Sequence, residues 1–328
     1  MRRFKNILYV ADSELKGGDT FERAVTLAEN NQARLTVVDV IERASAGSEM
    51  PEGGPIVADL QTAKERAHAQ GLEALIEPYR TRIEIQAKVL IGTPFLEIIR
   101  EVLRNGHDLV IKIPEHRDWM DRLFGSDDMH LLRKCPCPVW LIKPQAPKAY
   151  RRILAAVDVG VGDEHPPAEL ESRRALNRQI VEMASCLALT EFAELHIVHA
   201  WLAIGESAMR GAFMHTPEED VITYVEQVRR QCDASLDGLI REVTGDLGQD
   251  ALDYLKLQTH LVMGLARKEI PALAKRIEAD LVVMGTVART GVPGFIMGNT
   301  AETILNQIDC SVLAIKPPGF VTPITMEE

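Results

Sequence analysis

The sequence has few of the features that mark secreted, membrane-spanning or nucleic-acid-binding proteins. Its 328 residues include only five cysteines, at positions 135, 137, 186, 232 and 310. This small, odd number favours reduced thiols in a cytoplasm. No stretch approaches the 18 apolar residues that a membrane helix needs. The formal net charge is −11, which argues against nucleic acid and anionic lipid because both require clustered Lys and Arg. We therefore expect a cytoplasmic protein without a nucleic-acid or membrane partner.

Catalytic and metal-binding motifs are also missing. The chain has no G-x-S-x-G, no Walker A lysine loop and no His-Glu-x-x-His. Cys135-Pro136-Cys137 supplies two thiols with no suitably spaced Cys or His nearby, which favours buried thiols over a metal or redox pair. His199 and His260 fall near predicted strand ends, where they could approach one another, but core histidines are favoured over a metal site. We predict no catalytic residue and no metal.

An internal repeat runs through the whole chain. Five blocks recur in the same order: 5–12 with 151–158, 33–40 with 193–200, 83–103 with 255–275, 108–112 with 280–284, and 125–143 with 298–316. Chance similarity does not keep five blocks in order, so we infer a duplication. It predicts two domains, 1–149 and 150–328, which meet after the Pro-rich segment that ends at Tyr150.

Each half alternates short apolar runs with segments of helical periodicity. The predicted strands are 6–11, 34–40, 83–90, 108–113 and 138–143 in the first half, and 152–157, 194–200, 255–262, 280–284 and 311–316 in the second. The predicted helices are 20–31, 57–80, 94–105 and 126–134, then 167–189, 217–243, 267–278 and 299–308. Apolar strands without alternation are typical of strands covered on both faces. The sequence thus predicts an α/β fold in which each half is a doubly wound, five-stranded parallel sheet of order 3-2-1-4-5 with helices on both faces. A ligand would bind between strands 1 and 4.

The repeated motifs resemble the universal stress protein family, especially its tandem, two-domain E-type members. They include the opening K/R-x-I-L-x-x-x-D, the glycines Gly92 and Gly264 after strand 3, and C-P-V or C-S-V before the last strand. The resemblance implies a flavodoxin-like (Rossmann-like) sheet and, in some members, a bound adenine nucleotide such as ATP. Members that hold ATP carry G-x2-G-x9-G-[S/T] after strand 4.

The second half keeps part of this nucleotide loop. Gly285 and Gly298 match, whereas Ala288 replaces the second glycine and Asn299 the hydroxyl residue, with Thr300 one position late. Glycines let the backbone approach phosphate oxygens, and helix-start amides donate to them. Asn299 can also cap the helix. With the charge of Arg289, and with Asp158 and Ala200, which the family places against the nucleotide, the predicted site is Asp158, Ala200, Gly285, Ala288, Arg289, Gly298, Asn299 and Thr300. Loop capping for Asp158 and ordinary core packing for Ala200 remain alternatives.

The first half has lost most of the same loop. Pro114 removes an amide donor and Glu115 would repel phosphate, and only Gly125-Ser126 survives of the motif. The corresponding residues Asp12, Val40, Gly125 and Ser126 are therefore disfavoured as a nucleotide site. A structural first half is the better interpretation.

Three functions fit the sequence. The first is a cytoplasmic stress-response regulator that binds a small ligand, such as an adenine nucleotide, in the second half and acts through protein partners. The second is a slow ATP hydrolase that uses the same crevice. The third is a carrier of an amphiphilic ligand, because the insertion Trp201–Thr216 is rich in apolar side chains. A flap over the domain's own core explains that insertion equally well.

The last strands of the two halves are hydrophobic, and open hydrophobic edges promote aggregation. Family dimers pair these edges. We therefore predict that 138–143 pairs antiparallel with 311–316 inside one chain. The sequence leaves a further homodimer open.

Overall fold

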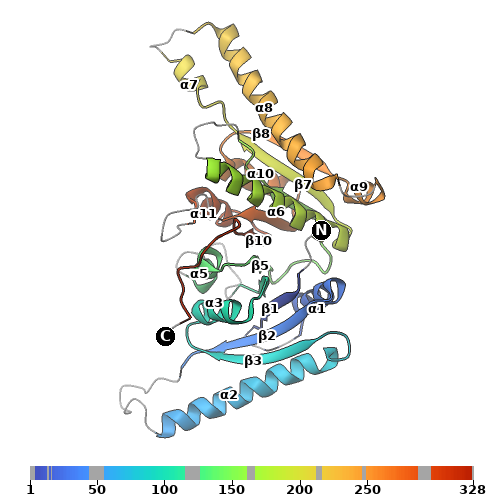
Figure 1. Ribbon diagram of the computed structural model, residues 1–328, viewed down its shortest axis with the longest axis vertical. Coiled ribbons are helices and arrows are strands. Elements are labelled where there is room, and N and C mark those ends of the chain that lie inside the picture. Colours follow the sequence, from blue (N-terminus) through green and yellow to red (C-terminus); the bar gives the residue numbers. More distant parts are fainter. Residues whose placement is uncertain are drawn as a thin grey trace.

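One continuous sheet runs through the whole molecule, with helices on both of its faces (Figure 1). The computed structural model describes residues 4–12, 15, 17–43, 55–114, 126–160, 167–211, 216–245, 249–286 and 297–326. The strand order is β3-β2-β1-β4-β5-β10-β9-β6-β7-β8. The strands are β1 (Asn6–Val10), β2 (Arg34–Ile41), β3 (Ile85–Ile91), β4 (Leu109–Lys112), β5 (Val139–Leu141), β6 (Arg152–Ala156), β7 (Glu194–Trp201), β8 (Gln258–Met263), β9 (Leu281–Gly285) and β10 (Ser311–Ile315).

Each half of the sheet is parallel and has the order 3-2-1-4-5. In the first half β1 lies between β2 and β4, and in the second half β6 lies between β7 and β9. The predicted flavodoxin-like architecture is confirmed on both sides of Tyr150.

Helices cover both faces of each half, and the sheet separates two hydrophobic cores. The helices are α1 (Asp19–Asn31), α2 (Pro55–Ile76), α3 (Pro94–Asn105), α5 (Asp127–Lys134), α6 (Pro167–Glu191), α7 (Glu206–Met209), α8 (Glu218–Thr244), α9 (Gln249–Leu255), α10 (Ala266–Arg276) and α11 (Asn299–Leu305), with a 3₁₀ turn at Glu77–Tyr79. One core packs α1, α2, α6 and α8 on the sheet, and the other packs α3, α5, α10 and α11 on the opposite face.

The two halves are joined by the only antiparallel pair in the described sheet. Trp140 of β5 lies opposite Leu313 of β10, and Leu141 lies opposite Val312. These side chains are buried, so the join hides two hydrophobic edges that water would otherwise reach. The predicted pairing of 138–143 with 311–316 is confirmed.

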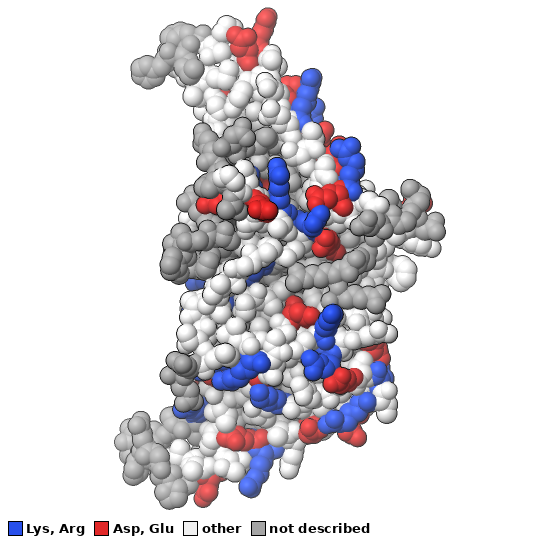
Figure 2. Space-filling model, in the orientation of Figure 1, with Lys and Arg blue, Asp and Glu red and all other residues white. Residues whose placement is uncertain are grey.

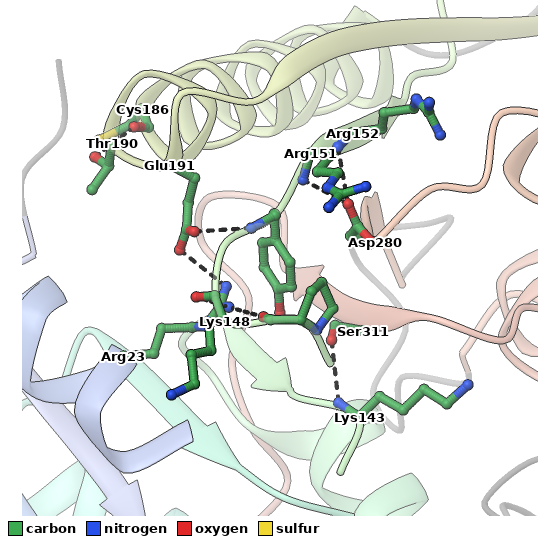
Figure 3. A network of polar contacts seen from close by, with 12 residues as sticks. Arg23, Lys143, Lys148, Arg151, Arg152, Cys186, Thr190, Glu191, Asp280 and Ser311 are labelled. Carbon is green, nitrogen blue, oxygen red and sulfur yellow. Dashed lines mark hydrogen bonds and ion pairs between the residues drawn. The ribbon is translucent and has the colours of Figure 1, made fainter. Parts of the chain in front are cut away.

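Polar contacts surround this join (Figure 3). The amide of Tyr150 donates to Glu191 Oε2 at 3.0 Å, and the amide of Lys143 donates to Ser311 Oγ at 3.2 Å. Arg23 donates to Glu191 Oε1 at 3.0 Å and lies over the Tyr150 ring, 3.8 Å from its centroid. The connection between the halves is therefore tied to helices of both.

Two elements in the second half differ from the sequence prediction. Residues 255–257 were assigned to a strand, but Leu255 ends α9 and β8 begins at Gln258. The prediction was wrong because Leu255, although apolar like its strand neighbours, is buried as the last residue of a helix. The insertion after β7 contains the short helix α7.

The segment after β10 returns to the first half. In Figure 1 it runs from β10 past α5 towards α3. Ile324 packs against the core that contains α3, α5, α10 and α11. Arg100 Nε of α3 donates to the Thr325 carbonyl at 3.5 Å. This crossing adds a second link between the halves.

Gly264 connects β8 to α10 in a backbone conformation that favours glycine. Its φ is +146°, its amide donates to the Trp201 carbonyl at 2.9 Å, and an added Cβ would lie 2.6 Å from Glu269 Cγ. We predict that Gly264→Ala lowers the free energy of unfolding by about 1–3 kcal/mol. Gly238→Ala is the control, because this α8 glycine has open space around it and alanine should stabilise the helix by about 0.5–1 kcal/mol. Urea denaturation of both variants checks this, and equal effects would contradict it.

Candidate functional site

A cavity of about 400 Å³ opens at the carboxyl edge of the second-half sheet, between β6 and β9. From β6 the chain continues to β7 on one side of this point, and from β9 it continues to β10 on the other side. This is therefore the topological switch point, where ligands of such sheets bind. The walls come from the ends of β6, β7 and β9 and from α6, α10 and α11. The volume is in the range of ordinary small-molecule sites, roughly 300–1,000 Å³.

Six of the eight predicted site residues lie together at this cavity. They are Asp158, Ala200, Gly285, Gly298, Asn299 and Thr300. Ala288 and Arg289 lie outside the described residues. The sequence thus identified the residues that meet here, although they are spread over more than 140 positions.

Asp158 begins the loop after β6 and is held by local contacts. Its Oδ1 accepts from the Gly160 amide at 3.2 Å, and its carboxylate lies 3.9 Å from Arg173 Nη1. Asn177 of α6 fixes the backbone, accepting from the Asp158 amide at 3.0 Å and donating to its carbonyl at 2.6 Å. The loop-capping role is therefore present, and the same carboxylate still borders the cavity.

His199 is buried in the cavity wall and directly precedes Ala200 near the end of β7. Its Nδ1 lies 3.2 Å from the Val157 carbonyl and 3.4 Å from the Val159 amide. Its Nε2 has no hydrogen-bond partner among the described residues. Burial lowers the pKa of His199, so the ring is neutral at neutral pH. Nε2 is itself buried.

The glycines and Asn299 act differently from the sequence expectation. Gly298 has φ −61° and is itself the N-cap of α11, without a side-chain cap, so Asn299 is the first helical residue and does not cap the helix. The Gly298 amide donates to the Thr286 carbonyl at 3.2 Å. At Gly285 an added Cβ would lie 2.7 Å from Leu176 Cδ2. Close packing on α6, rather than an unusual backbone angle, explains this glycine.

Sequence reasoning missed the α6 and loop residues of the site, namely Arg173, Asn177 and Thr286. Arg173 and Asn177 lie four positions apart on the predicted helix 167–189 and therefore share one face. Thr286 directly follows Gly285. Polar residues on the helix after strand 1 were the available signal, but helical periodicity alone does not show which face meets the crevice.

Thr286 leads from the cavity to a buried lysine. Lys316, 5% exposed, donates through Nζ to Thr286 Oγ1 and to the carbonyl of Leu132 in α5. Burial lowers the pKa of Lys316 to about 7, while nearby Cys135 and Cys137 act in the opposite direction. An amine of the second half thus reaches the last turn of a first-half helix.

The equivalent positions of the first half are filled by ion pairs. By the repeat, Lys112 corresponds to Met284 and Asp128 to Ala301, both of which line the second-half cavity. Lys112 Nζ contacts Asp128 Oδ1 at 2.7 Å, and both side chains are buried. Asp39, the counterpart of His199, pairs with His68 of α2. The groups that would face a ligand therefore bind one another.

The predicted first-half residues have structural contacts. Ser126 is the N-cap of α5, and its Oγ accepts from the Met129 amide at 3.2 Å. Val40 packs against the core that contains α3, α5, α10 and α11. The Asp12 carbonyl accepts from the Leu15 amide at 3.1 Å. Gly125 lies outside the described residues, as does Glu115.

The thiols and histidines outside the cavity belong to the core. The Sγ atoms of Cys135 and Cys137 lie 3.6 Å apart as buried free thiols, as expected. The hydrogen bond to Cys135, together with burial, raises the pKa of Cys137. His260 is paired with His196 instead of His199, which the sequence left as a possible neighbour. Val198 is the register partner of His260, and His196 Nδ1 is the atom 2.9 Å from His260 Nε2.

Charges of both signs are mixed over the face shown in Figure 2. Ion pairs on the helix surface include Arg229 with Glu226 in α8 and Arg210 with Glu218 at its start. Among the described residues, no helix combines the length and apolar character that crossing a bilayer requires.

Comparison with known proteins gives consistent results over both halves. The model of the universal stress protein family matches residues 3–143 and 149–316. Universal stress protein E of Escherichia coli K12 is 32% identical over 250 residues, covering 75% of this chain and 72% of the relative. Universal stress protein E of Photorhabdus laumondii is 29% identical, covering 99% and 98%. A solved Pseudomonas aeruginosa PAO1 protein, described as functionally unknown, has 25% identity and a TM-score of 0.66, covering 96% and 93%.

The lowered pKa of Lys316 predicts a pH-dependent stability. The unfolded chain holds this proton up to the ordinary pKa of 10.5, whereas the folded protein holds it only below about 7. Between these values the unfolded state binds more protons, so this lysine makes the free energy of unfolding rise with pH, by at most about 1.4 kcal/mol per pH unit.

Lys316→Met removes this contribution. We expect urea denaturation between pH 7.5 and 9.5 to show a smaller rise in stability for Lys316→Met than for the wild type. Lys143→Met, which removes the matching lysine of the repeat, should keep the wild-type slope. Identical slopes in all three proteins would contradict the prediction.

Proposed function

Because this chain belongs to the universal stress protein family, we propose that it is a cytoplasmic stress-response regulator whose second half binds an adenine nucleotide or another small ligand. Residues 1–149 and 150–328 are its two domains in this proposal, and protein partners receive the signal. The observation that carries the proposal is the meeting of six motif-derived residues at one cavity, at the switch point between β6 and β9.

The lining of the cavity suits parts of a nucleotide. The apolar side chains of Ala200, Ala266 and Ile270 suit the flat face of a base. Gly298, Asn299 and Thr300 present the backbone and a hydroxyl to the cavity, as oxygen-rich groups require.

Charge argues for a ligand with little phosphate in the described part of the cavity. Its charged side chains are Asp158, Glu169 and Arg173, and Arg173 already contacts Asp158 and donates to the Gly160 carbonyl at 3.2 Å. A nucleoside or monophosphate therefore fits this part better than a triphosphate. ATP hydrolysis has no specific contact in its favour here, because Asp158 makes the contacts of a turn residue.

Titration calorimetry with ATP, AMP and adenosine tests this function. We expect one saturable site per chain, weakened at least tenfold (about 1.4 kcal/mol) by Gly298→Val, which places a branched side chain at the cavity wall, and by Asp158→Ala. The control is Asp12→Ala, the same change at the first-half counterpart, which should bind as the wild type does. Absence of saturable binding for all three probes would refute the nucleotide proposal.

A second candidate, a carrier of an amphiphilic ligand, is favoured by the apolar surface beside the cavity. The insertion after β7 divides in two: Trp201 and Ala203 pack with Cys232 of α8, whereas Leu202 and Ile204 are exposed, Ile204 by 88%. Exposed Leu265 directly precedes Ala266, which lines the cavity. Exposed apolar side chains therefore lie within a few residues of Ala200 and Ala266 in the sequence, and a hydrocarbon tail that leaves the cavity would find apolar surface there.

A fluorescent long-chain fatty acid tests the carrier function. We expect the double variant Leu202→Ser, Ile204→Ser to bind it at least fivefold more weakly than the wild type, because the exposed apolar area is lost. Leu60→Ser, a change at a 60% exposed leucine of α2 in the first half, is the matched control. Equal affinity of all three proteins would exclude Leu202 and Ile204 from the binding surface.

A further inference from the structure

The first half touches the second-half cavity through α5. The last turn of α5 offers the Leu132 carbonyl to Lys316 Nζ, and the hydroxyl of Thr286 also donates to this carbonyl at 3.5 Å. One residue further on, Arg133 Nη2 contacts Glu302 Oε1 of α11 at 2.6 Å. Thr286 and α11 form two different walls of the cavity, so a single first-half helix reaches both.

Thr286 links these contacts to the backbone of the site. Its amide donates to the Ile315 carbonyl and its carbonyl accepts from the Gly298 amide, each at 3.2 Å. The side chain of Thr286 is fully buried, and its hydroxyl accepts from Lys316. A hydroxyl held on both sides fixes its rotamer. The position of Gly298, and with it the start of α11, therefore depends on a residue that Lys316 and Leu132 hold.

The reciprocal contact of the repeat differs. Lys143 corresponds to Lys316, and it reaches across to Asp309 after α11, with Nζ 2.6 Å from Oδ1 and 3.3 Å from the carbonyl. The Asp309 side chain is 66% exposed. Lys143 therefore makes a surface ion pair, of a kind that contributes little to stability, whereas Lys316 is buried against the cavity wall.

We propose that the first half is a scaffold for the second-half cavity, in which α5 holds Thr286 through Lys316 and α11 through Arg133. Lys316 and Arg133 are positioning residues, since neither lines the cavity. The first half, which lacks most of the nucleotide loop, then supports the cavity of the second half. The inference depends on the cavity and on no particular ligand.

Hydrogen exchange of the full-length protein tests the scaffold without a ligand. In Lys316→Met we expect the amides of Thr286 and Gly298 to exchange about tenfold faster than in the wild type, with peptides from β1 and β2 unchanged. Urea denaturation of the same variants measures their global stability. Faster exchange at Thr286 and Gly298 with unchanged β1 and β2 peptides is then local opening, because global unfolding would speed all of these amides.

Matched variants decide the outcome. Lys143→Met should leave Thr286 and Gly298 at wild-type rates, and Arg133→Met should speed exchange of the α11 amides, where Lys134→Met should not. Unchanged rates in Lys316→Met, or an equal increase in Lys143→Met, would overturn the proposal. If Lys316→Met fails to fold, the comparison of Arg133→Met with Lys134→Met decides it alone. Nucleotide titration of the same variants is a separate measurement, so failure of nucleotide binding leaves this result intact.

Discussion

The antiparallel pairing of β5 with β10 is the constraint on which the molecule depends. It turns two five-stranded sheets into one and buries Trp140 and Leu313 at their junction. Burying a large apolar side chain contributes about 1.5–3 kcal/mol, so two facing edges of such residues make the join costly to open. Because the pairing is antiparallel, each half presents its last strand and last helix to the other.

The two halves share a topology but differ in what fills the crevice. Lys112 and Asp128 close the first with an ion pair, where Met284 and Ala301 leave the second hollow. A buried ion pair gains little over apolar packing, because both charges lose their hydration. The difference between the halves therefore changes the space within the crevice more than the stability of the fold.

The repeat and the uninterrupted apolar strands were enough to predict the strand order. The hydrophobic last strands, together with the family resemblance, predicted the central join. Six residues of the candidate site were also predictable, because they lie at strand ends and in one loop. The parts that were missed depend on three-dimensional packing. The apolar sequence around Leu255 predicts a strand, but Leu255 is the last residue of α9. Asn299 was predicted to cap α11, but Gly298 is the N-cap residue. The hydrogen bond of Lys316 to the Leu132 carbonyl of α5 crosses between the halves. Sequence spacing does not show which side chains meet across the join.

The join also gives the first half a place in the structure of the second-half crevice. In a symmetric pair each last helix would support the other crevice equally. Here the second-half crevice is hollow, and the helix facing it, α5, is well anchored by its Ser126 cap and by the buried pair of Asp128 with Lys112. The residues that closed the first crevice thus stiffen the helix that borders the second. The ion pair of Lys112 with Asp128 therefore connects two differences between the halves, the filling of the first crevice and the anchoring of the helix beside the second.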